Sequence, residues 1–328
     1  MFVAEAGGAS HSELLSLSSA LFMAPTRTVR IGLLICGTLT GPVAAAHGDY
    51  YDVYNEYWRK ITPEDCPATV LVDSYHTRSM EFPKEEQLDD YDLFMITGSA
   101  NSAYDDTVPW IPVLISFLDG LIKNHPKVRI CGICFGHQIL GRVLGGECVH
   151  SGKWEIGPTS VELTDLGRSI FGTERLCLQQ MHRDLVPMES LSRQFASGEL
   201  ELLGSTGHTE NQGFVKFYPP SSGSDVVKAH QNIHIITVQG HPEFYESLIT
   251  GIVRQRAELM GPPTVSDYWG HKGGEYDDEP GEKDGTGRRW HKTDGFDIVA
   301  LVLWKMLGII PSTDVVSNIP GPEMVVAK

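Results

Sequence analysis

The chain has 328 residues, of which 41% are hydrophobic and 21% are charged, and this ordinary globular composition excludes collagen, a coiled coil and wholesale disorder. Its length fits one large domain or two modest ones, with enough material for a buried core. Asp and Glu number 42 against 26 Lys and Arg, a formal net charge of −16. Such a chain would repel phosphate backbones unless its cations gathered in one patch, so we expect no nucleic-acid partner.

The cysteine and hydropathy patterns predict a cytoplasmic protein without a membrane partner. Six scattered cysteines are too few for a disulfide framework, which indicates a reducing compartment. No uninterrupted apolar run reaches the roughly 18 residues of a membrane span, and the longest, Phe296 to Ile310, contains Asp297 and Lys305. Residues 1–28 lack the basic residues of a secretory or transit peptide before Arg27, so we expect a loosely ordered N-terminal extension.

The predicted elements alternate between buried strands and helices as far as residue 144. Short, mostly apolar runs predict strands at Val29–Cys36, Val70–Val72, Asp92–Ile96 and Val128–Ile133. Helices are expected at Ala44–Lys60, Pro109–Lys123 and Gly136–Leu144. This alternation predicts an α/β domain whose parallel sheet is covered by helices on both faces.

The pattern changes between Glu147 and Gln239. Short strand-like runs separated by Gly, Pro, Ser and Asp predict an attached antiparallel or mixed region, at Ser160–Leu163, Leu200–Leu203, Gly213–Tyr218 and His234–Val238. Two helices are expected afterwards, Phe244–Met260 and Phe296–Leu307, the second capped by Asp294. Residues 261–294 between them are rich in Gly, Asp, Glu and Pro, which indicates a surface insertion, and residues 311–328 form a C-terminal tail.

Cys134 has the surroundings of a nucleophile. It stands between a buried strand and a helix, with glycine two residues before it, Gly132, and two after it, Gly136. This is the pattern of a nucleophile elbow, a strained turn where larger side chains would collide with the neighbouring strand or helix. The helix N-terminus would also favour the thiolate.

A base for this thiol follows the strand His234–Val238. In an extended segment, residues two apart project to the same side, so His241 and Glu243 can touch, and Pro242 stiffens the link between them. The carboxylate would hold the imidazole in the tautomer that accepts a proton from Cys134. We therefore predict a catalytic triad of Cys134, His241 and Glu243.

Other interpretations of Cys134 stay open at this point. Cys131 and Cys134 form a Cys-x-x-Cys pair, which elsewhere indicates redox chemistry, although the first cysteine of a redox motif would occupy the helix start and here the second one does. No further cysteine pair or His spacing completes a zinc site, so no metal is expected. Cys134 could also be a small core residue, but that interpretation does not explain the glycines on either side of it.

Two segments together carry a family resemblance: Gly132–Gln138, Gly-Ile-Cys-Phe-Gly-His-Gln, and Gly240–Phe244, Gly-His-Pro-Glu-Phe. They resemble the class I, triad-type, glutamine amidotransferases, and more narrowly the stand-alone proteins similar to the glutaminase domain of GMP synthase. The resemblance runs from about Arg30 to Phe244 and implies one domain over 29–310. It implies a flavodoxin-like fold, a mostly parallel central sheet flanked by helices, and a Cys-His-Glu triad that forms a γ-glutamyl thioester. No cofactor is implied.

The resemblance also implies residues that bind the substrate. Gln138 corresponds to the glutamine that helps to hold the γ-glutamyl group. The oxyanion hole would use the backbone N–H of Phe135 and one from the turn after the third strand, here at Gly98 and Ser99, where the synthase-linked members usually carry Gly-Gly.

Two further segments resemble parts of the family's pocket. His182 and Asp184 lie in a segment of Ser-His-x-Asp type near the glutamine pocket, and for them substrate contact and a purely structural role both stay open. Tyr104–Asp106 and Trp110 are expected to shape the rim of the pocket.

Three functions are consistent with these observations. The protein could be a glutaminase that supplies ammonia to a separate synthetase or other acceptor enzyme, since no nucleotide-binding loop or synthetase-sized segment is present. It could instead be a γ-glutamyl peptidase that works alone on glutathione-type conjugates. The third function is a non-catalytic family member that binds a partner through the acidic insertion. The first two imply a small γ-glutamyl substrate.

Overall fold

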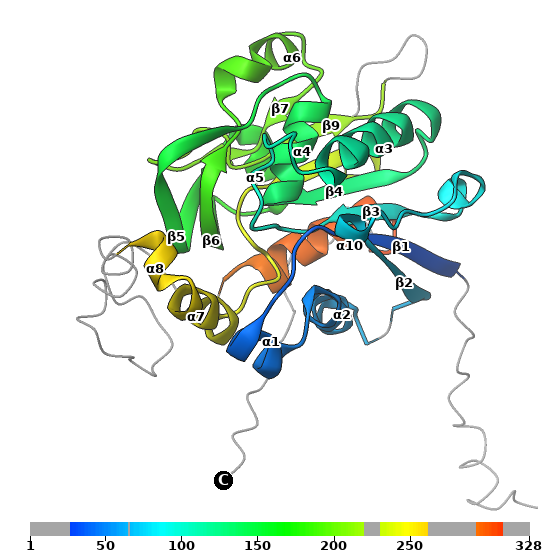
Figure 1. Cartoon of the computed structure of the whole chain (residues 1–328). Coiled ribbons are helices and arrows are strands. Elements are labelled where there is room, and N and C mark those ends of the chain that lie inside the picture. The colour runs from blue at the N-terminus through cyan, green and yellow to red at the C-terminus, as the bar shows by residue number, and fades with distance from the viewer. Residues whose placement is uncertain (1–26, 65, 220–229, 262–292, 311–328) are drawn as a thin grey trace, which may run out of the picture.

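The computed structural model describes residues 27–64, 66–219, 230–261 and 293–310 (Figure 1). The predicted N-terminal extension, the insertion over 261–294 and the C-terminal tail therefore fall almost wholly outside the described residues. Within the described ranges, no helix has both the length and the apolar character needed to cross a membrane.

Seven strands form the central sheet, in the order β2-β1-β3-β4-β10-β9-β7. The first five in this order are parallel to one another, and β9 and β7 extend the sheet in antiparallel fashion. Their bounds are β1 Arg27–Ile35, β2 Ala68–His76, β3 Leu93–Ile96, β4 Arg129–Ile133, β7 Glu201–Leu202, β9 Phe214–Phe217 and β10 Ile233–Val238. This mostly parallel sheet confirms the predicted α/β fold class.

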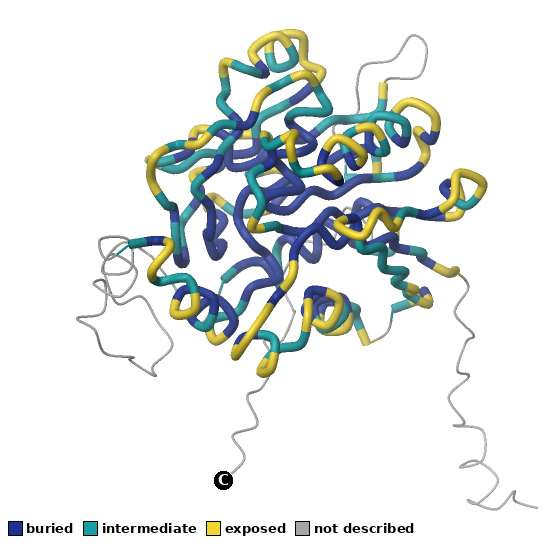
Figure 2. Tube along the Cα trace, viewed as in Figure 1, coloured by how far each residue is buried: buried dark blue, intermediate teal, exposed yellow. Residues whose placement is uncertain are grey.

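Helices cover both faces of the sheet (Figure 1). Side chains alternate along β1, so that Ile31 and Leu33 join one apolar layer and Leu34 joins the other. The first layer includes residues of α1 Gly41–His47, α2 Tyr50–Ile61, α7 Glu246–Gln255 and α10 Ala300–Met306. The second includes residues of α3 Trp110–Asn124 and α4 Phe135–Val143. Figure 2 shows the buried trace running through the sheet between these layers.

A second, antiparallel sheet has the strand order β6-β5-β8, which confirms an attached antiparallel region. Its strands are β5 Val149–Leu163, β6 Arg175–Leu185 and β8 Gly204–Ser205. Of the four strands predicted for this region only Ser160–Leu163 lies in it, within β5. The predicted strand His234–Val238 is β10, which pairs with β4 in parallel in the central sheet. The strand β6 was not predicted, because Gln179, Gln180 and His182 interrupt its apolar pattern. All three side chains are nevertheless buried, and the strand pairs with β5 along most of its length.

Two predicted helices are interrupted. The helix predicted over 44–60 is two helices, because Gly48 adopts a φ of 76° after α1 and Asp49 then forms a capping box with Asp52 at the start of α2. The helix predicted over 244–260 begins at Glu246 and breaks at Arg256, before the short α8 Ala257–Met260.

The last helix begins with a π-helical turn, η5 Gly295–Val299, before α10. Asp294 is its N-cap residue, as predicted, but the side chain makes no capping hydrogen bond. Its carboxylate accepts a hydrogen bond of 2.7 Å from the N–H of Cys177 on β6, and its backbone carbonyl accepts from Ile298. Asp294 therefore joins this helix to the small sheet. The other short helices are α5 Asp165–Phe171, α6 Ser192–Ala196, and the 3-10 turns η1 Thr77–Ser79, η2 Glu85–Asp90, η3 Met188–Leu191 and η4 His230–Asn232.

Candidate active site

Cys134 lies at the carboxyl end of β4, where the strand turns into α4. Its φ of 53° and ψ of −102° form a strained conformation for a residue with a side chain. A Cβ atom on Gly132 would lie 2.7 Å from the backbone of Gly136, and one on Gly136 would lie 2.5 Å from the carbonyl oxygen of Ile96 on β3. The strand and helix therefore approach one another as closely as the glycine pattern predicted.

His241 and Glu243 meet directly after β10. Nδ1 of His241 is hydrogen-bonded to Oε1 of Glu243 at 2.8 Å, and both side chains are buried. The imidazole stacks on the ring of Phe244, with centroids 3.9 Å apart, and the backbone N–H of His241 donates to the carbonyl of Gln179 on β6. Because Nδ1 is engaged by the carboxylate, Nε2 is the ring nitrogen left for Cys134.

The pKa of His241 depends on its contact with Cys134. Burial lowers the pKa of His241, but the charges of Glu243 and Cys134, together with hydrogen bonds to both side chains, outweigh burial and raise it to about 10. The imidazole is therefore protonated through neutral pH and lies beside the thiol that the sequence identified. The three residues of the predicted triad are brought together by the ends of β4 and β10, which are paired in the sheet.

The neighbouring histidine and cysteine do not offer the same chemistry. Burial lowers the pKa of His137 to about 3, and its Nδ1 bonds to the hydroxyl of Thr237 at 2.8 Å. Burial also raises the pKa of Cys131 to about 12, and all six cysteines are free. The redox interpretation thus gains no support. In the described part of the chain, no group of three or more His, Cys, Asp or Glu residues could hold a metal ion.

The turn after β3 lies against His241. A Cβ atom on Gly98 would be 2.8 Å from Cε1 of the imidazole. On its other side the carbonyl of Gly98 faces Gly37, where a Cβ atom would be 2.8 Å from that oxygen. Since C=O and N–H point in opposite directions in a trans peptide, the N–H of Ser99 points away from Gly37. Phe135 supplies the first N–H of α4, which has no acceptor within the helix.

Gln138 lies one turn along α4 from Cys134, facing the small sheet. Its Nε2 donates to the backbone carbonyl of Asp184 at 2.8 Å and to Oε1 of Gln239 at 3.2 Å. Two buried atoms of these same neighbours, Oδ1 of Asp184 and Nε2 of Gln239, find no hydrogen-bond partner among the described residues. An unpaired acceptor and an unpaired donor next to Gln138 are the groups that a polar ligand would satisfy.

His182 is held within the protein rather than presented to a ligand. Its Nε2 bonds to Oε2 of Glu155 at 2.9 Å and its Nδ1 to the carbonyl of Asp184 at 3.1 Å, which favours the structural role. Glu155, which no motif in the sequence indicated, is a buried carboxylate that also accepts hydrogen bonds from Thr206, Thr209 and Gln212. Burial raises its pKa, but these bonds and the charge of His182 lower it further, so Glu155 is ionised.

Two aromatic residues complete the site. Tyr54 on α2, also missed, donates a hydrogen bond of 2.9 Å to Glu243; its signal was the aromatic stripe of that helix. Trp110, expected at the rim, packs on Phe135 with ring centroids 5.3 Å apart. The neighbouring Tyr104 is 40% exposed, and Asp106 pairs with Arg142 of α4 at 2.9 Å.

Comparison with known proteins identifies the family. Residues 50–253 match the family model described as glutamine amidotransferase class-I. A glutamine amidotransferase-like protein of Schizosaccharomyces pombe is 31% identical over 236 residues, which cover 68% of this chain and 83% of that protein. Gamma-glutamyl peptidase 5 of Arabidopsis thaliana is 27% identical over 237 residues, covering 70% and 82% of the two chains.

The fold is also that of a solved member. The crystal structure of a glutamine amidotransferase from Thermotoga maritima superposes with a TM-score of 0.54 at 16% identity, covering 85% of this chain and 98% of the other. At this identity the likeness concerns the fold. The family match and the yeast relative together establish that this chain belongs to the class I glutamine amidotransferase family.

Proposed function

We propose that the protein cleaves γ-glutamyl amide bonds by acyl transfer to Cys134. The observation that carries this proposal is the contact of the buried His241–Glu243 pair with a cysteine held in a strained turn at a helix N-terminus. A protonated imidazole and a helix dipole both favour the thiolate, which is the nucleophilic form of cysteine. A structural cysteine would need none of these features.

The reaction proceeds in two steps. The Cys134 thiolate attacks the γ-carbonyl carbon, and the N–H groups of Phe135 and Ser99 stabilise the oxyanion. His241 gives its proton to the departing amine, which leaves a γ-glutamyl thioester. His241 then takes a proton from water, the hydroxide attacks the thioester, and glutamate leaves while the Cys134 thiolate is re-formed beside the protonated imidazole. Glu243 holds the imidazole in the required orientation throughout.

The glutamyl group would be bound on the side of Gln138. Oδ1 of Asp184 is an acceptor suited to the α-ammonium group, and Nε2 of Gln239 is a donor suited to the α-carboxylate. Leaving either atom unpaired and buried costs about 1–3 kcal/mol, so a ligand that satisfies both is favoured.

A γ-glutamyl peptide is a second candidate substrate beside glutamine. It is supported by the similarity to the Arabidopsis protein named as a gamma-glutamyl peptidase. The glutaminase alternative requires a separate enzyme that accepts ammonia. The two differ in product, because a glutaminase releases ammonia with glutamate and a peptidase releases glutamate with an amino compound.

The purified full chain should be incubated with L-glutamine and, separately, with a γ-glutamyl tripeptide, and ammonia and glutamate should be measured independently. We expect glutamate from at least one substrate, and acid quenching should trap a mass increase of one glutamyl group on the Cys134 peptide. Cys134→Ala should abolish both signals. Cys66→Ala is the matched control, since Cys66 is partly exposed and far along the chain from the elbow.

Turnover that survives in Cys134→Ala would overturn the proposal. Absence of any thioester and of glutamate with every γ-glutamyl substrate would instead favour the non-catalytic alternative. The acidic insertion required by that alternative lies outside the described residues.

A further inference from the structure

Glu155 on β5 and His182 on β6 form a buried pair next to the residues proposed to bind the glutamyl group. The two lie opposite one another in the antiparallel register, so their side chains project from the same face of the small sheet. His182 is 3% exposed and Glu155 is 7% exposed. A buried pair of ionisable groups is costly unless further hydrogen bonds satisfy it. In this protein those further bonds lead to both walls of the glutamyl pocket, which we define as Gln138 between Asp184 and Gln239.

The first wall of this pocket is Asp184 on β6. Its backbone carbonyl accepts two hydrogen bonds, from Nε2 of Gln138 at 2.8 Å and from Nδ1 of His182 at 3.1 Å. The other ring nitrogen, Nε2 of His182, lies 2.9 Å from the carboxylate of Glu155. Because both nitrogens face acceptors, the imidazole carries a proton on each and is positively charged. His182 thus fixes the backbone from which the unpaired Oδ1 of Asp184 projects.

The second wall, Gln239, follows β10 of the central sheet. Its Oε1 accepts a hydrogen bond from Gln138 at 3.2 Å, and its backbone N–H donates to the carbonyl of Gln212 at 2.9 Å. The side chain of Gln212 reaches back to the buried pair, because its Nε2 donates to Oε2 of Glu155 at 2.8 Å. Its Oε1 accepts from Gln180 on β6 at 3.1 Å, which fixes the orientation of the amide. Glu155 is therefore connected to the second wall through Gln212.

These hydrogen bonds close a ring around the glutamyl pocket. Its members, in order, are Glu155, His182, Asp184, Gln138, Gln239 and Gln212. The ring joins the small sheet, α4 and the central sheet. The two unpaired atoms suited to the substrate, Oδ1 of Asp184 and Nε2 of Gln239, belong to two of its members. The distance between these atoms is therefore set by the ring as a whole.

A carboxylate is well suited to hold such a ring. Oε2 of Glu155 accepts hydrogen bonds from His182, Gln212 and Thr209. Hydrogen bonds to an ionised acceptor are shorter and roughly twice as strong as those between neutral groups. A pocket whose walls are fixed beforehand loses less conformational freedom when a ligand binds, so the ring should increase affinity.

We propose that Glu155 and His182 are positioning residues that set the affinity of the pocket for the glutamyl group. This inference rests on the proposed γ-glutamyl transfer. His182 acts through the backbone of Asp184, and Glu155 acts through His182 and Gln212. Changing either residue should therefore weaken substrate binding, while the cleavage step at Cys134 is retained.

The test measures binding without turnover. Titration calorimetry of the full chain carrying Cys134→Ala gives the dissociation constant of L-glutamine. His182→Gln, which offers one nitrogen in place of two, should raise this constant about tenfold in the same background, as expected when a charge-assisted hydrogen bond no longer positions the ligand. With Cys134 intact, the same change should raise KM and leave kcat unchanged, because it removes binding common to ground state and transition state.

Thr209→Val is the matched control for stability. The hydroxyl of Thr209 also donates to Oε2 of Glu155, at 3.0 Å, but Thr209 is not a member of the ring. Both Thr209→Val and His182→Gln should lower the free energy of unfolding, because each removes a hydrogen bond to a buried carboxylate. Only His182→Gln should change the dissociation constant of glutamine.

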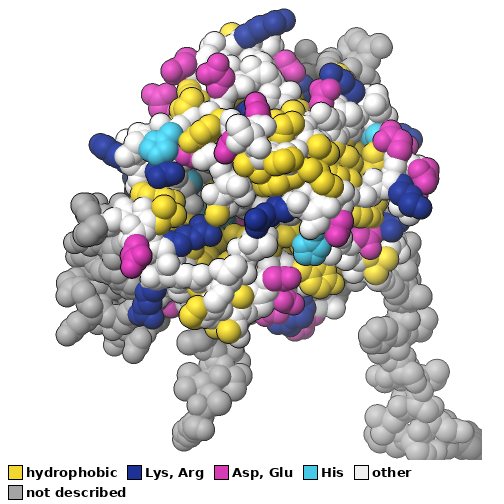
Figure 3. Space-filling model, in the orientation of Figure 1, with side chains coloured by type: hydrophobic (Ala, Val, Ile, Leu, Met, Phe, Trp, Pro, Cys, Tyr) yellow, Lys and Arg dark blue, Asp and Glu magenta, His cyan; other side chains and the backbone are white. Residues whose placement is uncertain are grey.

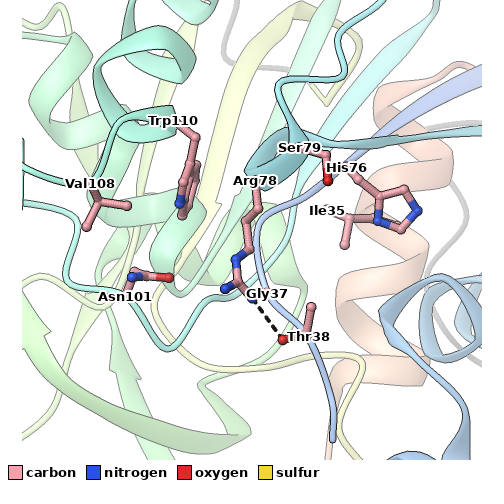
Figure 4. Close-up of a pocket in the computed structure, with 9 residues that line it drawn as sticks. All are labelled: Ile35, Gly37, Thr38, His76, Arg78, Ser79, Asn101, Val108 and Trp110. Carbon is pink, nitrogen blue, oxygen red and sulfur yellow. Dashed lines mark hydrogen bonds between the residues drawn. The ribbon is translucent and has the colours of Figure 1, made fainter.

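Arg78→Gln is the control for loss of a positive charge. Arg78 lines a separate cavity of about 490 Å³ at the ends of β1 and β2, where its guanidinium donates to the hydroxyl of Thr38 at 2.9 Å (Figure 4). This cavity adjoins the start of α3, and the space-filling view shows hydrophobic side chains gathered over the region of that helix and the loop before it (Figure 3). None of the described residues that line the cavity belongs to the ring, so Arg78→Gln should leave glutamine binding unchanged.

The outcomes separate the two proposals. If the Cys134→Ala chain binds neither L-glutamine nor a γ-glutamyl peptide, and the wild-type chain cleaves neither, the proposed function is wrong. If glutamine binds equally well with and without His182→Gln, or if Thr209→Val weakens binding as much, only the positioning role is wrong. Should His182→Gln not fold, Glu155→Gln decides by the same comparison.

Discussion

The phenol of Tyr54 donates a hydrogen bond of 2.9 Å to Oε1 of Glu243, the same oxygen that binds Nδ1 of His241. The two residues lie on elements far apart in the chain, α2 and the segment after β10. Glu243 is fully buried, and Oε2 has no hydrogen-bond partner among the described residues. A buried carboxylate must be held by donors, so Tyr54 both stabilises its charge and sets its orientation toward the imidazole.

Removing this phenol should weaken both the fold and catalysis. A hydrogen bond to a charged group contributes about 1.5–3 kcal/mol, so Tyr54→Phe should lower the free energy of unfolding by about that amount. We also expect kcat to fall about tenfold, because Glu243 gains freedom to rotate. Tyr57→Phe is the control, since its hydroxyl donates at 3.0 Å to the neutral carbonyl of Gly295. Equal kcat values for Tyr54→Phe and wild type would show that Tyr54 does not orient the triad.

The carboxylate of Glu243 should govern the pH profile of the reaction. His241 must be protonated to stand beside the thiolate, so the wild-type rate should decline only as pH rises through about 10. Glu243→Gln removes the negative charge that raises the pKa of His241, whereas the burial that lowers this pKa persists. The alkaline limb of the rate profile should therefore move to lower pH. The rate should also fall about 10²–10⁴-fold. The measurement is kcat/KM against pH, with Glu246→Gln of α7 as control; an alkaline limb that stays near 10 would contradict the assignment.

Gly98→Ala tests the contact between the turn after β3 and the imidazole. The added Cβ atom would lie 2.8 Å from Cε1 of His241, so the ring must move. A displacement of about 1 Å at a catalytic group can cost roughly 100-fold in rate, which is the loss in kcat we expect. Gly120→Ala on α3 is the matched control, because no atom lies within 4 Å of its new Cβ, and it should leave activity unchanged. Similar kinetics for the two variants would remove Gly98 from the site.

Glu155 should contribute stability that depends on pH. Its folded pKa lies below the ordinary value of 4.5, so the contribution is complete above pH 4.5 and is lost as pH falls through the lowered folded value. Glu155→Gln places an amide against the donors of His182, Thr209 and Gln212, and should cost about 2–4 kcal/mol at neutral pH. Urea unfolding at neutral and acidic pH should show the difference from wild type shrinking in acid. The control Glu162→Gln, at an exposed position of the same strand, should change the free energy of unfolding little. A difference between Glu155→Gln and wild type that does not change with pH would show that Glu155 is not ionised.

The local sequence was sufficient for the parts of the site that lie within a few residues of one another. Gly132 and Gly136 were predicted to flank the elbow because of steric limits, and the structure shows the close approaches that require them. The contact of His241 with Glu243 followed from the two-residue period of an extended segment. Strands with continuous apolar runs, such as β1 and β4, were found within a residue or two of their bounds.

The elements that were not predicted depend on features that the local apolar pattern does not show. In β6 the polar side chains of Gln179, Gln180 and His182 suggested an exposed segment, but all three are buried. Gln180 donates to Gln212, and His182 is hydrogen-bonded to Glu155, both from other segments. The break between α1 and α2 depends on the conformation of Gly48 and on the capping box at Asp49. The overall helical pattern of residues 44–60 shows neither feature.

The sequence by itself determined the family and most of the order of strands and helices, and it predicted the nucleophile and its base, because these depend on short-range sterics and periodicity. Only the tertiary structure decided that Tyr54 holds Glu243 and that Glu155 holds His182. Each of these contacts depends on which residues from different segments meet in the folded chain. That meeting is set by the packing of the whole chain, and no local pattern encodes it.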